Sequence, residues 1–210
     1  MTTRVLLADD HSLFAQALAR LLAQRYEVVD VVGDGRALQA SARTHQPDVI
    51  VADITMPLMN GLESVRSLRK DGHIPKIVFL TMHVDTQLAR ECFSCGGSGF
   101  VTKDAGFDEL STAIDTVMSN QVYVSPNVAA GLMDPSKQPS STEPGGDQLT
   151  SRQREILQLL AEGKTMKEIA TATNLSTRTV EWHKHRIMKM LGVRRSAELI
   201  QHAIRMKLVI

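Results

Sequence analysis

The sequence predicts two domains of different class: a doubly wound α/β sheet of five parallel strands, then a smaller all-α domain of four helices. Between residues 4 and 119, short apolar runs alternate with amphipathic stretches of helical spacing, which is typical of βαβ units. Beyond residue 147 only helical spacing remains. The charge divides at the same place: residues 1–146 carry 12 Lys and Arg against 17 Asp and Glu, and residues 147–210 carry 12 against 6. We therefore expect an acidic and a basic domain that meet different partners.

The five expected strands are continuously apolar, because helices cover both faces of a parallel sheet with right-handed crossovers. These strands are Arg4–Ala8, Glu27–Val32, Asp48–Ala52, Lys76–Leu80 and Gly99–Thr102. These strands and the helical stretches between and after them place the first domain at residues 1–122.

Residues 123–147 are expected to form a linker. They contain four prolines, the pair Gly145-Gly146 and several serines, a composition that buries too little apolar surface to offset the entropy of ordering. A short helix is expected within it, near Asn127–Met133. The second domain, residues 148–210, is expected to contain the helices Ser151–Glu162, Met166–Thr173, Thr177–Leu191 and Ser196–Lys207.

Neither a membrane-spanning protein nor a secreted one is expected. No apolar run approaches the roughly 20 residues of a membrane-spanning helix, and no charged and then apolar leader opens the chain, so we expect a soluble cytoplasmic protein. Cys92 and Cys95 have the spacing of a redox pair or half a metal site. They share a helix face with Val84 and Leu88, so we interpret them as packing residues.

Functional side chains gather at the predicted carboxyl ends of four strands. Asp9 and Asp10 follow the first strand, Asp53 the third, Thr81 the fourth and Lys103 the fifth. Ligands bind at that edge of an open parallel sheet. Three carboxylates repel one another unless a cation lies between them, and Mg²⁺ prefers such oxygen ligands. Together with a lysine and a threonine, the cluster indicates a phosphoryl group handled on an aspartate.

Residues 3–120 resemble the receiver domain of two-component response regulators. The resemblance rests on the acidic, threonine and lysine residues just named and on Met56-Pro57 and Gly61 after Asp53. It implies a flavodoxin-like fold in which Asp53 accepts a phosphoryl group from a sensor histidine kinase or a small phosphodonor.

The resemblance also implies roles for neighbouring residues. Mg²⁺ is expected on Asp10, on Asp53 and on the backbone carbonyl of Thr55, with Asp9 acting through water. Lys103 and Thr81 would stabilise the phosphate, and the position of the switch aromatic, usually tyrosine, holds Phe100. Met82 stands where many receivers have a smaller residue, so we expect slow exchange of the phosphoryl group.

Residues Leu149–Leu208 resemble the LuxR-type helix-turn-helix domain of NarL/FixJ response regulators, in which the domains follow the same order. The resemblance implies binding to specific double-stranded DNA and dimerisation on activation. Its matching residues are Leu149-Thr150, Arg152, Arg154-Glu155-Ile156-Leu157, Gly163, Lys167-Glu168-Ile169-Ala170, Leu175-Ser176, Thr179-Val180, His183 and Leu191-Gly192-Val193.

The third predicted helix of that domain, Thr177–Leu191, has one apolar and one polar face at helical spacing. On the polar face we assign Trp182 and His185 to base edges, and Arg178, Lys184 and Lys189 mainly to phosphates. Glu181 is unusual, because proteins of this family commonly have lysine or arginine at the matching position. A carboxylate repels phosphate but accepts a hydrogen bond from cytosine. We therefore expect Glu181 to restrict the range of DNA sequences that the protein binds and to weaken nonspecific affinity.

The leading functional interpretation is a DNA-binding transcription regulator controlled by phosphorylation. The alternative is a DNA-binding regulator that is independent of phosphorylation, whose first domain is a protein-interaction module. A metabolic enzyme is not expected, because no second set of catalytic residues is visible. Expected partners are DNA, a sensor histidine kinase and a second copy of the chain, with no membrane.

Overall fold

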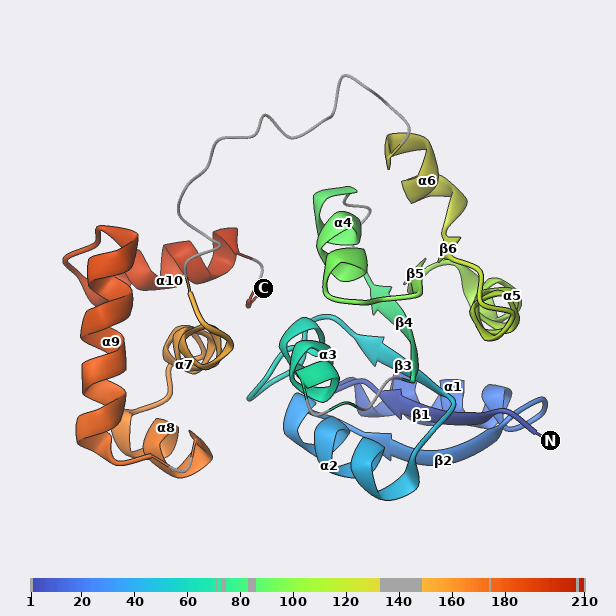
Figure 1. Ribbon diagram of the computed structural model, residues 1–210, viewed down its shortest axis with the longest axis horizontal. Coiled ribbons are helices and arrows are strands. Elements are labelled where there is room, and N and C mark those ends of the chain that lie inside the picture. Colours follow the sequence, from blue (N-terminus) through green and yellow to red (C-terminus); the bar gives the residue numbers. More distant parts are fainter. Residues whose placement is uncertain are drawn as a thin grey trace.

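The computed structural model describes residues 2–70, 72, 75–82, 86–132, 149–173, 175–206 and 208–209. They form an α/β domain and a helical domain (Figure 1). The strands are β1 (Arg4–Ala8), β2 (Glu27–Val32), β3 (Val49–Asp53), β4 (Lys76–Thr81), β5 (Gly99–Thr102) and β6 (Tyr123–Val124). The helices of the α/β domain are α1 (Ser12–Leu22), α2 (Gly35–His45), α3 (Gly61–Lys70), α4 (Thr86–Ser94), α5 (Gly106–Met118) and α6 (Pro126–Leu132).

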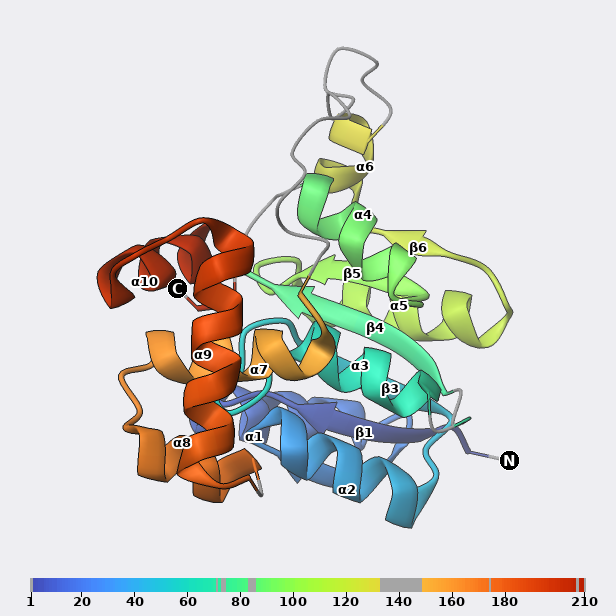
Figure 2. The ribbon, with the colours of Figure 1, turned by 60° about the vertical axis from the view of Figure 1, so that its left-hand side comes forward.

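The strands form one parallel sheet in the order β2-β1-β3-β4-β5-β6. The chain runs outward from β1 to β2, then crosses to β3 on the other side of β1, so the topological switch point lies between β1 and β3. Helices α1 and α5 cover one face, and α2, α3 and α4 cover the other (Figures 1 and 2). The doubly wound parallel sheet predicted from the sequence is confirmed, and its crevice lies at the carboxyl ends of β1 and β3.

Alternate residues of each strand belong to different cores. Leu6 and Ile50 lie in the core under α2, α3 and α4, whereas Val5, Leu7 and Val51 lie in the core under α1 and α5. All five side chains are fully buried. This explains the unbroken apolar runs of β1 and β3, because neither face of these central strands meets water.

Among the described residues the sheet has six strands, one more than the five predicted. Strand β6 pairs in parallel with β5, and α6 follows it and packs on α4, where Val128 is fully buried. A strand of two residues is too short for an apolar period to reveal it. These elements lie in residues 123–132, within the expected linker; the rest of that linker, residues 133–147, lies outside the described residues.

The helical domain consists of α7 (Ser151–Ala161), α8 (Met166–Thr173), α9 (Thr177–Leu191) and α10 (Ser196–Arg205). Its helix ends follow from local chemistry. Thr150 and Gln153 form a capping box at the start of α7, and the Ser176 side chain accepts a hydrogen bond from Thr179 N at the start of α9. Gly192 ends α9 with a φ of 68°, which glycine adopts without steric cost.

Helix α7 joins the two domains by packing against α3, while α9 lies on the outer side of the helical domain (Figures 1 and 2). Within the part of the chain that the structure describes, no helix is both long and apolar enough to cross a membrane.

Candidate functional site

The acidic residues predicted to converge do meet at the switch point of the sheet. Asp9 and Asp10 follow β1, Asp53 ends β3, and one oxygen of each, together with His11 Nδ1 or Nε2, lies within 4.8 Å of the others. Asp10 is exposed, but Asp9 and Asp53 are only 2% and 4% exposed. A cluster of buried and exposed carboxylates of this kind could hold a metal ion.

Lys103 supplies the positive charge of the cluster. Its Nζ lies 2.6 Å from Asp9 Oδ2 and 2.6 Å from Asp53 Oδ2, so one ammonium joins carboxylates from two strands. Burial lowers the pKa of Lys103, but its hydrogen bonds and charge interactions with Asp53 and Asp9 outweigh burial and raise the pKa above its usual value. Lys103 therefore stays a cation.

Asp53 lies in a tightly packed position. Burial raises the pKa of Asp53, while the hydrogen bond and the charge of Lys103 act in the opposite direction. The backbone N–H of Thr55 donates to Asp53 Oδ1 at 3.2 Å. A Cβ at Gly61 would come within 2.3 Å of the Asp53 carbonyl oxygen, so α3 approaches the end of β3 only because its first residue is glycine.

His11 was missed by the sequence reasoning. Its Nδ1 lies 3.1 Å from one oxygen of Asp9, 3.1 Å from one of Asp10 and 3.9 Å from one of Asp53. The available signal was its position directly after the acidic pair. An imidazole in this place adds a nitrogen to the groups that could hold a metal.

The residues expected to respond to phosphate surround the same edge of the sheet. Thr81 is buried at the end of β4, and its carbonyl oxygen accepts a hydrogen bond from Lys103 N at 2.7 Å. Phe100 is fully buried in the core that α4 and α6 share. Met82, directly after Thr81, is 72% exposed. Phe100 therefore lies inward, and Met82 lies on the surface.

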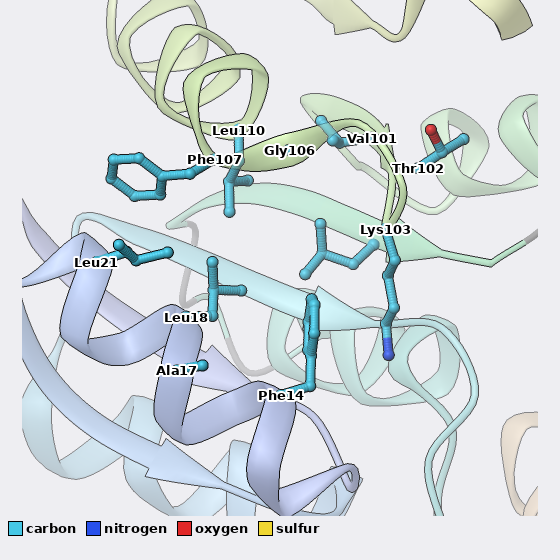
Figure 3. Close-up of a pocket in the computed structure, with 11 residues that line it drawn as sticks. Phe14, Ala17, Leu18, Leu21, Val101, Thr102, Lys103, Gly106, Phe107 and Leu110 are labelled. Carbon is cyan, nitrogen blue, oxygen red and sulfur yellow. The ribbon is translucent and has the colours of Figure 1, made fainter.

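An apolar pocket of about 140 Å³ borders the cluster between α1 and α5 (Figure 3). Phe14 and Leu18 of α1 face Phe107 and Leu110 of α5, and the Phe14 ring centroid lies 5.1 Å from the Nζ of Lys103. Lys103 is the one ionisable residue of its lining, so the pocket offers apolar contact beside the acidic site rather than chemistry of its own.

Cys92 is buried on α4 and Cys95 is buried directly after the last residue of that helix, and both pack in the core as the sequence predicts. Burial raises the pKa of the Cys92 thiol far above its usual value and that of Cys95 to about 11. Both thiols are therefore protonated at neutral pH, which disfavours redox chemistry or metal binding because both need the thiolate.

Helix α9 presents the polar face that its spacing predicts. Its inner side is held by Val180 and Ile187, both fully buried. On its outer side Trp182 is 54% exposed. The other predicted DNA-contacting residues are exposed, except for the half-buried Lys184: Arg178, Glu181, His185 and Lys189.

Arg186 was not among the predicted contacts. It is exposed, and its guanidinium lies 5.2 Å from the centroid of the Trp182 ring. The spacing of four residues on a helix was the signal, because residues i and i+4 share a face. His185 Nδ1 lies 2.9 Å from the Glu181 carbonyl oxygen, which orients that ring along the helix. Arg186 thus extends the cationic outer side of α9.

Known proteins match both halves of the chain. The family described as response regulator receiver domain matches residues 5–115, and bacterial regulatory proteins of the luxR family match residues 147–203. The chain belongs to the response regulators. Its receiver domain carries the acidic cluster, and its LuxR-type DNA-binding domain carries α9.

Relatives of this response regulator align along almost its whole length. The transcriptional regulatory protein MctR of Rhizobium johnstonii is 32% identical over 204 residues, which cover 96% of this chain and 92% of MctR. The response regulator GacA of Pseudomonas aeruginosa is 32% identical over 205 residues, with 96% and 95% covered. UvrY of Escherichia coli K12 is 31% identical, with 96% and 93% covered.

Solved structures support the same assignment. A LuxR-family response regulator from Aurantimonas has a TM-score of 0.60 at 31% identity, over 63% of this chain and 96% of that chain. The response regulator ChrA of a heme-sensing two-component system gives 0.53 at 29% identity, over 99% of both chains. RcsB of Salmonella typhimurium, at 23% identity and a TM-score of 0.58 over 96% of this chain and 97% of its own, shows a shared fold.

Proposed function

We propose that this response regulator binds specific DNA sequences under the control of phosphorylation at Asp53. The observation that carries the proposal is the single ammonium of Lys103 between Asp9 and Asp53 at the switch point of the sheet. That arrangement provides a carboxylate nucleophile, a fixed cation for the incoming phosphoryl oxygens and a further carboxylate for a metal.

The residues of the cluster fit Mg²⁺. Three carboxylates stand against one lysine, so the site carries surplus negative charge, and oxygen donors are those that Mg²⁺ prefers. Asp10, Asp53 and the Thr55 carbonyl would hold the ion, with Asp9 acting through water. When bound, Mg²⁺ would neutralise charge on the phosphoryl oxygens.

In the proposed reaction an oxygen of Asp53 attacks the phosphorus of a kinase phosphohistidine or of a small phosphodonor. The bond from phosphorus to the donor breaks, and an aspartyl phosphate forms. A carboxylate is a weak nucleophile, so the protein acts mainly through positioning and charge neutralisation. Lys103 pairs with the phosphoryl oxygens, and the Thr81 hydroxyl donates a hydrogen bond to one of them. This is the one reaction we propose for the chain.

The second half of the proposal concerns α9. Its N-terminal part would enter a major groove, with Trp182 and His185 at base edges and Arg178, Lys184 and Lys189 at phosphates. The response regulator RcsB, which shares this fold at 22% identity and a TM-score of 0.60, has been solved in complex with DNA. A two-fold dimer would read half-sites roughly 34 Å apart or a multiple of that distance. If it binds chromosomal DNA as proposed, the protein would work in the cytoplasm.

Selection from a random DNA library tests the proposal. The full-length protein is used with and without a small phosphodonor plus Mg²⁺, and Asp53→Asn is the control. We expect enrichment of a two-fold site that depends on the donor and is lost in the variant. Failure to enrich any sequence under either condition would contradict sequence-specific binding.

One observation favours the alternative of phosphorylation-independent binding. The polar face of α9 is exposed although Asp53 is unmodified and the two domains are packed together. Equal enrichment in all three samples would support this alternative, in which the receiver domain serves protein interactions.

A further inference from the structure

The loop between β3 and α3, residues 54–60, follows the phosphoacceptor and is held by a residue of the other domain. Gln158 of α7 is 1% exposed. Its Nε2 donates to the Met56 carbonyl oxygen at 2.7 Å, and its Oε1 accepts from Asn60 N at 3.0 Å. One side chain of the DNA-binding domain therefore satisfies two backbone groups of the phosphoacceptor loop. Buried backbone groups are costly to leave unpaired, so the loop shape depends on this contact.

Leu58 gives a second, independent sign that α7 shapes the loop. Its φ is 66°, in the left-handed region that favours glycine. Its side chain packs against the apolar core of the DNA-binding domain. A leucine keeps such a backbone only where its surroundings hold it there. Here the surroundings belong to the other domain, so separating the domains would release the loop to relax.

Two ion pairs beside the loop hold α7 in place. Arg154 Nη1 lies 3.1 Å from Glu63 Oε1, and Arg36 pairs with Glu155. Glu63 and Glu155 are both buried. Each is also paired with an arginine of its own domain, Arg66 or Arg152, so breaking an interdomain pair would leave the buried carboxylate with one cationic partner in place of two. The domain contact thus combines polar, charged and apolar interactions around one loop.

The same loop forms a wall of the phosphoacceptor site. Thr55 N lies 3.2 Å from Asp53 Oδ1, and the Asp53 side chain is almost completely buried. A phosphoryl group on Asp53 adds bulk and charge beside this wall, so the loop must move to receive it. The contacts of α7 are made with the loop as it lies beside the unmodified carboxylate. They therefore stabilise the unmodified state relative to the phosphorylated one.

We propose that the docked helix α7 restrains the phosphoacceptor loop through Gln158 and Leu58 and thereby slows phosphorylation of Asp53. Gln158 is a positioning residue in this scheme. The proposal rests on the proposed phosphorylation of Asp53. Since such coupling is reciprocal at equilibrium, phosphorylation loosens α7 by the same free energy with which α7 opposes phosphorylation. The outer side of α9 is exposed while α7 is docked, so the proposed control acts on the receiver domain and not by covering α9.

The test is the initial rate of phosphorylation of the full-length protein by acetyl phosphate and Mg²⁺. Gln158→Ala removes both hydrogen bonds, and Leu58→Gly removes the apolar contact while keeping a residue that tolerates the left-handed φ. Gln201→Ala changes an exposed glutamine of the same domain and is the matched control. We expect both loop-contact variants to react roughly fivefold faster or more than the unmodified sequence, and the control to match it.

The double variant separates this role from a general loss of structure. If both residues act through one docked contact, Gln158→Ala with Leu58→Gly is no faster than the faster single variant, whereas independent damage would add. Urea unfolding checks that each variant folds. If Gln158→Ala does not fold, Leu58→Gly alone tests the inference. Unchanged or slower phosphorylation in the folded variants would overturn the inference. Absence of phosphorylation in every protein, including the unmodified sequence, would instead overturn the proposed function.

Discussion

Lys103 connects carboxylates that come from two different strands, and the acidic site depends on its charge. Without it, the buried Asp9 and Asp53 would face each other without the ammonium that now joins them. The cost of removing one partner from a buried pair exceeds that of losing an exposed ion pair, because the remaining charge stays out of water.

We expect Lys103→Ala to lower the free energy of unfolding at pH 7 by roughly 3 kcal/mol when a chelator is present. Urea unfolding of the full chain measures this, with exposed Lys164→Ala as the control. Adding Mg²⁺ should recover more stability in Lys103→Ala than in the unmodified protein. Equal stability of both proteins in the chelator would show that the Lys103 pairs contribute nothing net.

Met82 belongs to the same edge of the sheet and is a second residue with a specific expectation. Its exposed side chain follows Thr81, where a smaller residue would leave the site more open to water. We expect Met82→Ala to shorten the lifetime of the aspartyl phosphate several-fold, measured by loss of the phosphorylated band with time. Hydrolysis complete within seconds in the unmodified protein would contradict the shielding role.

Glu181 places a carboxylate on the surface that should meet DNA. If it accepts a hydrogen bond from cytosine N4, Glu181→Ala will lose about 1–3 kcal/mol of discrimination at one base pair and gain affinity for unrelated sequences. Library selection with both proteins measures the change. An unchanged preferred sequence would exclude direct readout by Glu181.

Sequence reasoning found the acidic, threonine and lysine residues at strand ends, but it missed His11, Arg186 and the residues whose neighbours come from the other domain. Asp53, Thr81 and Lys103 could be predicted because the carboxyl ends of parallel strands meet at one edge. Gln158 could not, since a polar residue in a helix normally faces water, and its burial arises from packing between domains. Arg186 could have been predicted, because it follows Trp182 by four residues and therefore shares its helix face.

At the scale of elements, periodicity located the five longer strands and the four helices of the DNA-binding domain to within about two residues. Strand β6 escaped because its two residues are defined by pairing with β5: Tyr123 N donates to Ser98 O at 3.1 Å, and Ser125 N to Phe100 O at 2.9 Å. Such pairing is a property of tertiary structure, and no local sequence pattern predicts it. Helix ends, by contrast, follow from single residues.

The start of α9 gives a measurable case. Ser176 accepts from Thr179 N at 3.1 Å, so Ser176→Ala leaves that N–H without its cap. We expect Ser176→Ala to lower the free energy of unfolding of the DNA-binding domain by about 1 kcal/mol. Thermal unfolding of the full chain, monitored by circular dichroism, measures this loss. Thr177→Ala, one residue later and exposed, is the control and should change stability much less. A loss as large in Thr177→Ala would argue against capping as the cause.

At the scale of the whole molecule, the division of charge assigns the domains to different tasks. The net charge of +1 hides a basic stretch, residues 147–210, that follows an acidic one. The order of domains could be predicted from composition. Their docking could not, because it depends on complementary surfaces that involve a buried glutamine, two ion pairs and one leucine.

The basic domain should make DNA affinity strongly dependent on salt. Each neutralised phosphate contributes about −0.9 to the slope of log K against log salt. Helix α9 carries four cations, the exposed Arg178, Arg186 and Lys189 and the half-buried Lys184, so a dimer in which all of them contact phosphates is expected to show a slope of roughly −7. Lys189→Ala should reduce the slope by about one per subunit. Titrations at several salt concentrations measure this, and a flat dependence would exclude phosphate contacts as the main source of affinity.

The chain contains one tryptophan, Trp182, and it stands half-exposed on α9 beneath the guanidinium of Arg186. Fluorescence excited at the red edge of indole absorption therefore originates from a single point on the surface that should contact DNA, and the receiver domain contributes no indole signal. The unlabelled protein thus contains its own optical probe. A fluorescence change on adding DNA would report on that surface directly, and a change on adding a phosphodonor alone would show that an event at Asp53 had reached α9.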